Sequence, residues 1–418
     1  MGKPVRAFAV LAVVSMAVAA CGGGSDGGGG GGGDTLIISS DLPLQGASKD
    51  ASDATNKAIE LYLSQVGNKA GDYTIKFQKY DDSTASAGKW DSGQCTKNAT
   101  AHVQNTDEVA VMGTFNSGCA KIEVPILNQD PDGPMLMVSH ANTNPGLTKT
   151  WDPGEPDKYY PKSTRNYARV VTTDDFQGAA AAAYAASDLG VKKVYVLNDN
   201  ETYGQGVAKS FAEGAPKNGI TVVANEAWDA KATNYTALFQ KVKASGADAV
   251  YLGGIYDNNG GQLVKDKVTV LGDNTKVKLI APDGFTGYPE FNKLPEAAGT
   301  YLTFAGLTTD QLRANGGAGA KLLDDFKAKY GADPASNYAL YGVSAIQVIL
   351  AAIEASDGTR KGVRDALFEK GITISADKSV LGKEITIDKT SGDVNAKDIS
   401  VEIVKDGKET FVKAQSVE

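Results

Sequence analysis

Polar side chains follow several apolar, strand-like segments, at the points where open α/β sheets place their ligands. Ser117 comes shortly after the segment that ends at Gly113 and directly before a predicted helix, so its hydroxyl and the helix amides could hold an anion. Asp283 follows another such segment and offers a carboxylate to a cation. Segment 139–145, with the sequence SHANTNP, adds hydroxyl and amide groups. This set could hold a small molecule that carries both charges, although a helix cap at Ser117 and a turn at Asp283 are the plainer alternatives.

Catalytic and metal-binding chemistry find little support in the sequence. The only histidines are His102 and His140, and no Ser/His/Asp order or phosphate-binding Walker loop accompanies them. A secreted hydrolase would need a nucleophile–base pair, which we do not find. The glycine-rich segment 22–33 matches the dinucleotide spacing GxGxxG by composition alone, with no strand before it and no helix after it. We therefore expect a protein that is not an enzyme and has no cofactor or metal; a ligand contact by His140 is a minor alternative.

The first residues predict an exported protein. Lys3 and Arg6 precede an apolar run over 7–20, which is shorter than the roughly 20 residues needed to span a bilayer and has the length of a signal-peptide core. Three small residues, Val18, Ala19 and Ala20, precede Cys21. Together the four residues resemble the lipobox of bacterial lipoproteins, in which the cysteine is acylated. We predict a lipoprotein signal peptide over 1–20 and a lipidated Cys21 with a glycine-rich tether over 21–34. An ordinary secretory peptide is the alternative.

The net charge argues against some classes of binding partner, and the cysteine content bears on whether a disulfide forms. Removal of the two positive charges of the predicted signal peptide changes the formal net charge from −8 to −10, which argues against nucleic acid or an anionic membrane surface as the main partner. The mature chain keeps Cys95 and Cys119. In an oxidising compartment an even pair predicts one disulfide, with two buried free thiols as the alternative.

The rest of the chain alternates short apolar segments with helical periodicity. Segments 36–38 and 109–112 have the length of strands, and segments 54–66 and 176–189 have the pattern of helices. Strands that are continuously apolar and separated by helices predict parallel sheets buried on both faces. The series occurs twice, and the chain is long enough for two domains. We therefore predict an α/β fold with two doubly wound parallel-sheet lobes.

The order of the segments predicts which parts of the chain build each lobe. The junction between the two series lies near 169–171, and three helical stretches beyond 304 are expected to pack back onto the first lobe. Segments 384–387 and 399–404 are expected to pair as strands around Ser391-Gly392, in the second lobe. The predicted domains are 35–170 with 304–381 for lobe 1, and 171–303 with 382–418 for lobe 2.

From about Leu36 to Gly392, nearly the whole mature chain resembles the leucine/isoleucine/valine-type binding proteins of ABC importers, which have the type I periplasmic-binding fold. Each matching segment is weak alone, but their order and spacing make the resemblance specific. The segments are DLPLQG, KYDDSTASAGKW, VMGTFNSGCA, MVSHANTNPGLT, TDDFQG, VLNDNETYGQGVAKSF, GADAVYLGG, LIAPDGF and YALYGVSAI. The resemblance implies two lobes joined by three hinge crossings, as in a Venus flytrap.

The resemblance also implies a ligand site. It places the serine that binds the ligand carboxylate at Ser117, and it places the backbone and hydroxyl that grip the ligand at Ala141 and Thr143. The acidic residue that pairs with the ammonium falls on Asp283, and the tyrosine that closes over the ligand falls on Tyr203. All five belong to our predicted ligand-binding set.

Two positions depart from the family pattern around the ligand side chain. Aromatic residues common in the family would fall near Ala51 and on Ile255, which has Tyr256 beside it. We include Tyr256 in the predicted ligand-binding set and expect the side-chain pocket to differ from that of a leucine binder. Cys95 is also displaced from the usual first disulfide cysteine, whereas Cys119 lies close to the usual second one.

The resemblance implies an extracytoplasmic, lipid-anchored monomer that captures an amino acid, most readily a branched-chain or other aliphatic one. The partners implied are that ligand and the permease subunits of an ABC importer, with membrane contact through the lipid anchor only. A sensor or binder of amides, urea or another small polar solute with the same fold is the alternative.

Overall fold

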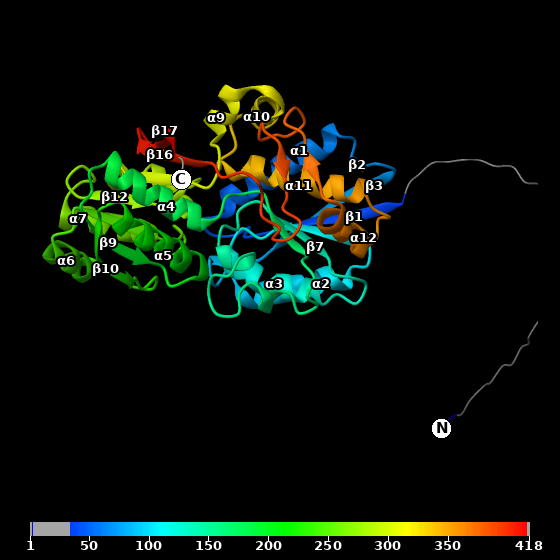
Figure 1. Cartoon of the computed structure of the whole chain (residues 1–418), viewed down its shortest axis with the longest axis horizontal. Helices are drawn as coiled ribbons and strands as arrows, with labels where there is room; N and C mark the ends of the chain where they lie inside the picture. The colour runs from blue at the N-terminus through cyan, green and yellow to red at the C-terminus, as the bar shows by residue number, and fades with distance from the viewer. Residues whose placement is uncertain (1, 3–33, 416–418) are drawn as a thin grey trace, which may run out of the picture. The chain divides into compact units, whose positions relative to one another are not determined.

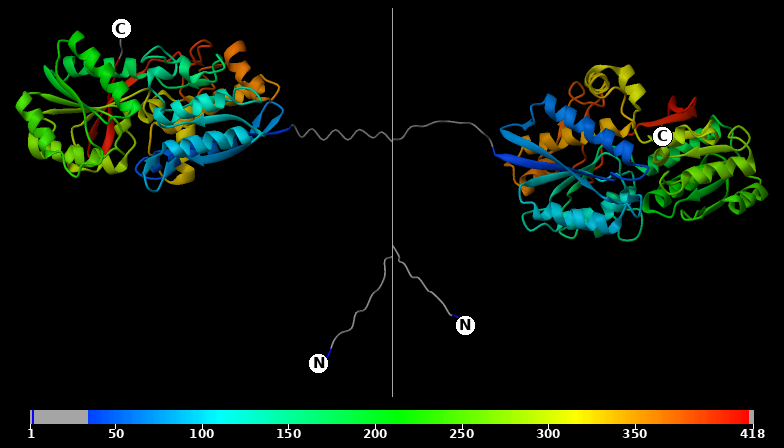
Figure 2. Two further views of the ribbon diagram at one scale, coloured as in Figure 1. Left: turned by 90° about the horizontal axis from the view of Figure 1, so that it is seen from below. Right: turned by 180° about the vertical axis from the view of Figure 1, so that it is seen from behind.

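The structure is a computed structural model that describes residue 2 and residues 34–415. The predicted signal peptide, the acylation at Cys21 and the tether up to residue 33 lie outside the described residues. Within the described part, none of the helices is long and apolar enough to cross a membrane. Residues 34–415 form two lobes that lie side by side, each built around its own sheet (Figures 1 and 2).

The sheet of the first lobe has six strands in the order β2-β3-β1-β6-β7-β8. All neighbours pair in parallel except β2 and β3. The strands are β1 (Thr35–Leu42), β2 (Lys69–Ala70), β3 (Tyr73–Asp81), β6 (Glu108–Gly113), β7 (Leu136–Ser139) and β8 (Tyr167–Arg169), and the small hairpin β4 (Ser83–Thr84) with β5 (Lys89–Trp90) follows β3.

Helices cover both faces of this sheet because successive strand residues point to opposite sides. Ala110 and Met112 of β6 lie in one core, with α1 and α11, while Val111 lies in another, with α3. A disulfide joins Cys95 of α2 to Cys119 of α3, which confirms the predicted pairing. The helices of this lobe are α1 (Lys49–Gln65), α2 (Ser92–Gln104), α3 (Ser117–Asn128), α10 (Gly317–Tyr330), α11 (Tyr338–Glu354) and α12 (Arg360–Asp365).

The sheet of the second lobe has seven strands in the order β10-β9-β11-β12-β13-β16-β17, and only the pairings of β16 are antiparallel. Val194 and Val196 of β9 pack with α4 and α5, whereas Tyr195 and Leu197 pack on the other face with α6 and α7. The strands are β9 (Lys193–Asn198), β10 (Thr221–Ala227), β11 (Ala249–Gly253), β12 (Lys278–Ala281), β13 (Tyr301–Phe304), β16 (Ile399–Lys405) and β17 (Lys408–Gln415). The helices are α4 (Asp174–Ser187), α5 (Thr202–Lys217), α6 (Thr236–Ser245), α7 (Gly260–Leu271) and α8 (Pro289–Asn292); α9 (Thr309–Asn315) follows β13.

The predicted pairing of 384–387 with 399–404 is wrong. The first segment contains β15 (Ile385–Thr386), which pairs with β14 (Thr373–Ile374), and its isoleucines lie in the core of the first lobe. β16 instead forms a hairpin with β17 around Asp406 and Gly407, both with positive φ. An Asp-Gly pair of this kind makes the tight turn whose twist suits a two-residue hairpin, so the local turn chemistry decides the partner of β16.

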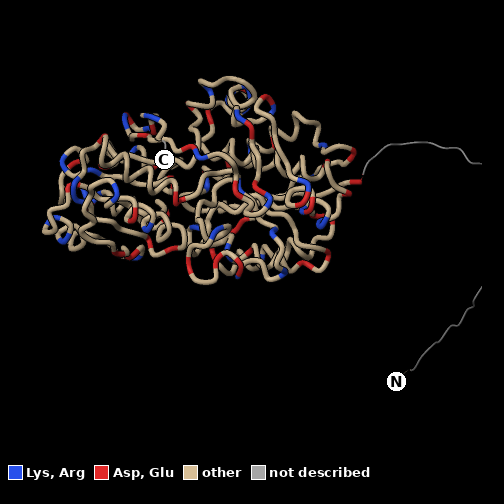
Figure 3. Tube along the Cα trace, viewed as in Figure 1, with Lys and Arg blue, Asp and Glu red and all other residues tan. Residues whose placement is uncertain are grey.

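Acidic and basic residues are interspersed along both lobes (Figure 3). A network of buried charge interactions lies where the chain leaves the first sheet, at Arg169. This side chain is fully buried and donates from Nε to Asp393 (2.9 Å), from Nη1 to the carbonyls of Asn142 (2.7 Å) and Asn144 (2.9 Å), and from Nη2 to the hydroxyl of Thr148 (2.6 Å).

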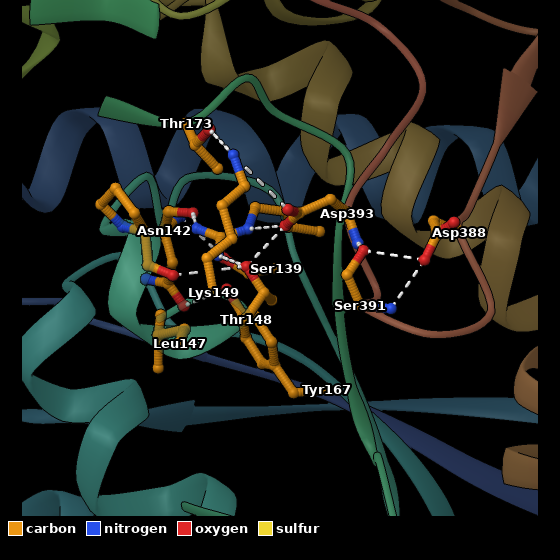
Figure 4. Close-up of polar contacts among 12 residues, drawn as sticks. Ser139, Asn142, Leu147, Thr148, Lys149, Tyr167, Thr173, Asp388, Ser391 and Asp393 are labelled. Atoms are coloured by element: carbon orange, nitrogen blue, oxygen red, sulfur yellow. Dashed lines mark hydrogen bonds and ion pairs between the residues drawn. The ribbon is translucent and has the colours of Figure 1, made fainter. Parts of the chain in front are cut away.

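Neighbouring contacts extend this network between two distant parts of the chain (Figure 4). The Thr148 hydroxyl donates to Asp393 (2.8 Å), and the Lys149 ammonium donates to Thr173 (2.9 Å). The backbone approaches closely as well, because a Cβ at Gly392 would lie 2.2 Å from the carbonyl oxygen of Tyr167. Arg169 therefore fastens the loop after β7 to the segment that returns toward the second sheet.

We expect Arg169→Ala to destabilise the protein by about 3–5 kcal/mol, because it leaves a largely buried carboxylate and two carbonyls without their donors. Urea unfolding followed by circular dichroism measures this. The matched control is Arg313→Ala, since Arg313 is 35% exposed and its partners Asp324 and Asp333 are also exposed. That control should cost less than about 1 kcal/mol. Equal effects of the two substitutions would contradict the role of Arg169.

Candidate functional site

A cavity opens between the two lobes and holds about 290 Å³ of space free of protein atoms, part of it open to solvent. Both lobes contribute to its wall. The residues that line it are Phe115, Asn116, Ser117, Ala141 and Tyr338 from the first lobe, and Tyr203, Ile255, Asp283 and Gly284 from the second. The structure thus brings four of the predicted site residues to one cavity: Ser117, Ala141, Tyr203 and Asp283.

The first-lobe wall offers donors for an anion. Ser117 is the first residue of α3, so the free amides of the first helical turn lie beside it. Its hydroxyl is buried and lies 3.4 Å from the backbone nitrogen of Asn144. A helix N-terminus with a serine hydroxyl is a favourable place for a carboxylate or another small anion.

The loop after β7 holds Ala141 against the cavity. The hydroxyl of Ser139 accepts hydrogen bonds from the backbone of Ala141 (3.1 Å) and Asn142 (2.9 Å), which turns the chain sharply at the strand end. The amide of Asn142 donates to the carbonyls of Thr114 (2.8 Å) and Phe115 (3.1 Å) and so ties this loop to the one before α3.

Thr143 lies in the same loop but is not among the residues that line the cavity. It is fully buried, and its carbonyl accepts a hydrogen bond from the backbone of Asp174 (2.9 Å) at the start of α4. This contact fixes the first lobe's loop to the first turn of a second-lobe helix.

Asp283 is the centre of the second-lobe wall. It lies two residues after β12, is almost fully buried, and accepts hydrogen bonds from three side chains: the amide of Gln177 (2.7 Å) and the hydroxyls of Tyr203 and Tyr338. Burial raises the pKa of Asp283, and these hydrogen bonds oppose the rise. Because Tyr338 comes from α11 of the first lobe, the carboxylate is held from both sides of the cavity.

A second carboxylate, that of Asp174, lies close enough to Asp283 to interact with it. Burial and the neighbouring Asp283 raise the pKa of Asp174 well above its usual range. Its Oδ2 atom has no hydrogen-bond partner among the described residues. The Asp283 carboxylate, which lines the cavity, therefore gives the second-lobe wall a preference for a positive charge.

Two further residues raised by the sequence do not line the cavity. The ring of Tyr256 packs against Phe285, Tyr288 and Phe291, so this predicted contact lies in an aromatic cluster of the second lobe, and Ile255 faces the cavity in its place. His140 is fully buried, and neither ring nitrogen has a hydrogen-bond partner among the described residues. Burial lowers the pKa of His140 to about 3, so the ring is neutral.

Contacts at the rim of the cavity also join the lobes. The carboxylate of Asp257 accepts from the backbone (3.1 Å) and the hydroxyl (2.9 Å) of Ser48 and from the hydroxyl of Tyr288 (2.7 Å). Glu201 of the second lobe receives the indole N–H of Trp90 (3.0 Å) and pairs with Lys89. These rim contacts join the two lobes directly.

Sequence reasoning did not select Phe115, Asn116 and Tyr338 of the wall, nor Gln177, which contacts Asp283. Gln177 and Tyr338 each donate to Asp283. Both lie within segments that carried the family resemblance, TDDFQG and YALYGVSAI. Polar side chains at the start of otherwise apolar helices were the available signal.

The chain matches the family described as "Periplasmic binding protein" over residues 42–408. An "Amino acid binding protein" of Pseudomonas aeruginosa is 26% identical over 353 residues, which are 81% of this chain and 79% of that protein.

Two solved structures share the fold across nearly all of both chains. A branched-chain amino acid transporter substrate-binding protein of Streptococcus pneumoniae, in complex with isoleucine, has a TM-score of 0.74 at 22% identity, with 92% of this chain and 99% of the other covered. A solute-binding protein of an ABC transporter from Rhodopseudomonas palustris, in complex with p-hydroxybenzoic acid, has a TM-score of 0.74 at 18% identity, with 92% and 98% covered. With two parallel-sheet lobes, a cavity lined by both and a family match over most of its length, the chain belongs to the periplasmic binding protein family.

Proposed function

We propose that this protein captures a small aliphatic amino acid in the cavity between its lobes and delivers it to an ABC importer. The single observation that carries the proposal is the opposite chemistry of the two walls. The start of α3 with Ser117 lies on one wall, and the buried carboxylate of Asp283 lies on the other. An α-amino acid carries a carboxylate and an ammonium on one carbon and needs such a pair of walls.

In the proposed complex the ligand carboxylate accepts from the Ser117 hydroxyl and the free amides of α3. The backbone of Ala141 adds to the grip on the ligand, whereas Thr143, predicted as a contact but absent from the cavity wall, supports the same loop through its bond with Asp174. The ammonium pairs with Asp283, and Tyr203 and Tyr338 keep that carboxylate oriented. An ion pair inside a protein is favourable only when the remaining hydrogen bonds of both charges are satisfied, and the three existing donors to Asp283 meet this condition on the protein side.

Since the ligand touches both walls only when the lobes are together, it shifts the equilibrium toward the closed form by its differential affinity for the two forms. The closed form then presents the surface that the permease subunits recognise. We also propose the lobe boundaries deduced from the sequence, except that residues 385–394 belong with the first lobe, because Ile385, Ile387 and Val394 lie in its core.

The wall near the ligand side chain is apolar and aromatic, formed by Phe115, Ile255 and the ring of Tyr338. An aliphatic side chain would bury its surface there at about 25 cal/mol per Å². Ile255 replaces an aromatic residue of the family pattern and alters the shape of this pocket, so we propose aliphatic amino acids as a class.

The relative that binds p-hydroxybenzoic acid makes an aromatic carboxylate the second candidate ligand. Such a ligand could use the Ser117 wall but has no cation to offer. It would leave the Asp283 carboxylate of the cavity wall without a positive charge beside it, which is why we favour an amino acid. An amide or urea sensor would face the same difficulty.

We further propose that the protein works outside the cytoplasm as a monomer tethered to the membrane. The predicted signal peptide, Cys21 and the glycine-rich segment support this proposal. A glycine-rich tether behaves as a flexible chain, so the body could reach the permease while staying near the membrane.

A thermal-shift screen of solutes tests the ligand class. Leucine, isoleucine, valine and alanine are the amino acids to try, against p-hydroxybenzoate, acetamide and urea. A ligand at about 100 times its dissociation constant should raise the free energy of unfolding by about 2.7 kcal/mol. We expect stabilisation by at least one aliphatic amino acid and by none of the others. Stabilisation by p-hydroxybenzoate or an amide alone would overturn the proposal.

Asp283→Asn should weaken binding of the amino acid found in that screen by at least about 30-fold, or 2 kcal/mol, because truncating one partner of a desolvated charge pair costs about 2–5 kcal/mol. Isothermal titration calorimetry measures the affinity. Asp229→Asn is the matched control, since Asp229 is an exposed aspartate of the same lobe and should leave binding unchanged. Wild-type affinity in the Asp283 variant, with its fold intact by circular dichroism, would contradict the ammonium role.

Cys21→Ser should move the protein from the membrane fraction to the soluble extracytoplasmic fraction, because a serine cannot carry the thioether-linked lipid. Fractionation of bacterial cells that express either form, followed by detergent phase partitioning, measures the change. If the wild-type protein already partitions into the aqueous phase, the anchor is absent and the leader is an ordinary secretory peptide.

A further inference from the structure

The first lobe contains a second group of buried ionisable side chains, which the amino-acid site does not use. We call it the acidic cluster; its members are Asp41, Asp82, His102, Glu108 and Glu123, all fully buried. Asp41 lies on β1, Asp82 follows β3, and Glu108 begins β6. His102 lies on α2 and Glu123 on α3, the two helices that run side by side along one face of the sheet (Figure 1).

His102 is held between two of these carboxylates. Its Nδ1 atom lies 2.7 Å from Oε1 of Glu108, and its Nε2 atom lies 3.2 Å from Oδ2 of Asp41. One side-chain atom from each of Asp41, His102 and Glu123 lies within 4.8 Å of the other two. Two carboxylate oxygens and an imidazole nitrogen therefore converge on one point, from three separate elements of the fold.

An independent feature is that other carboxylate atoms of the cluster have no hydrogen-bond partner. Among the described residues nothing donates to either oxygen of Asp82 or to Oε2 of Glu123. Oε1 of Glu123 lies 3.5 Å from Sγ of Cys119, but that sulfur is in the disulfide and has no hydrogen to donate. The Asp82 carboxylate also faces this disulfide, within 4.8 Å of both sulfurs.

Four buried acids thus share one imidazole as their cation. Buried polar atoms in proteins are nearly always hydrogen-bonded, and buried carboxylates are normally paired with a cation or bound to a metal. With one imidazole for four acids, the cluster has fewer basic than acidic groups.

We propose that this cluster is the binding site of one divalent transition-metal cation such as Zn²⁺, held by Asp41, Glu123 and Nε2 of His102, with Asp82 as the adjacent balancing charge. Glu108 would orient the imidazole through Nδ1, as carboxylates commonly do for metal-bound histidines. Imidazole with carboxylates suits zinc and its neighbours. Calcium instead takes six to eight oxygen ligands, more than these side chains supply.

A cation at this point would be structural. It would fasten α2 and α3 to β1 beside the disulfide, and its binding free energy would add to the stability of the first lobe. The sequence led us to expect no metal, because the proposed ligands lie far apart along the chain, with a separation of 61 residues between Asp41 and His102, and share no short spacing motif. The inference does not depend on the identity of the ligand in the cavity.

The test uses protein expressed from the full-length sequence. Metal content is measured by mass spectrometry as purified, and the protein is then stripped with dipicolinate and titrated with Zn²⁺ by calorimetry. Because the cluster is closed to solvent, the titration is repeated on protein refolded from urea with Zn²⁺ present. We expect one equivalent of metal per chain, and visible d–d absorption bands of the cobalt ion when Co²⁺ replaces Zn²⁺.

Two variants locate the site. Glu123→Gln keeps the shape of the side chain and should lose at least 100-fold in zinc affinity, while Glu108→Gln should lose about 10- to 100-fold through the ring orientation. Asp199→Asn is the control, since Asp199 is a buried carboxylate of the second lobe whose oxygens already accept three hydrogen bonds; it should bind zinc as the wild type does. Absence of stoichiometric metal by both routes, or wild-type affinity in the Glu123 variant, would overturn the site and leave protonated carboxyl groups as its explanation.

Discussion

The chemistry of the cavity depends on one carboxylate, that of Asp283, which is buried at the boundary between the two lobes and must still be able to contact a ligand. A buried charge is tolerated only if its hydrogen bonds are met. The donors come from α4, α5 and α11, so three helices from both lobes must arrive at one point. The alternating strand and helix order makes this convergence possible, because parallel sheets bring all their strand ends to one edge. The first-lobe wall has a simpler construction, because the first turn of α3 and the hydroxyl of Ser117 supply its donors.

Much of the fold could be predicted because its signals are local. The apolar runs of strand length at 36–38 and 109–112 lie in the strands β1 and β6, and most of the segment at 176–189 lies in α4. The pairing of β15 could not be predicted, since short strands carry little pattern and the partner is chosen by packing. Ile385 has its partner in β14, which precedes it, and the Asp406-Gly407 turn closes a different hairpin.

The site could be predicted in part for the same reason. Ser117, Ala141 and Asp283 follow strands, where position alone suggests a ligand role, and all three line the cavity. Tyr338 and Gln177 start or occupy helices, and their contact with Asp283 exists only because helices distant in sequence meet there. Tyr256 was predicted from its neighbour in the family pattern, but in the structure its ring faces Phe285 and Phe291. Ile255 and Tyr256 follow Gly253-Gly254, and adjacent side chains on a turn point in different directions. Sequence spacing alone does not tell which of the two faces the cavity.

The rim contacts between Ser48 and Asp257, and between Trp90 and Glu201, involve no atom of any ligand. The free energy that these contacts add when the lobes are together is therefore the same for every solute bound in the cavity. Strengthening or weakening one of them would multiply the affinities for all solutes by a common factor and preserve their order of preference. The cavity wall thus sets the order of preference among ligands, and the rim contacts scale the affinity for all of them. Substitutions at the rim could therefore shift the ligand concentration at which the protein binds without changing its selectivity.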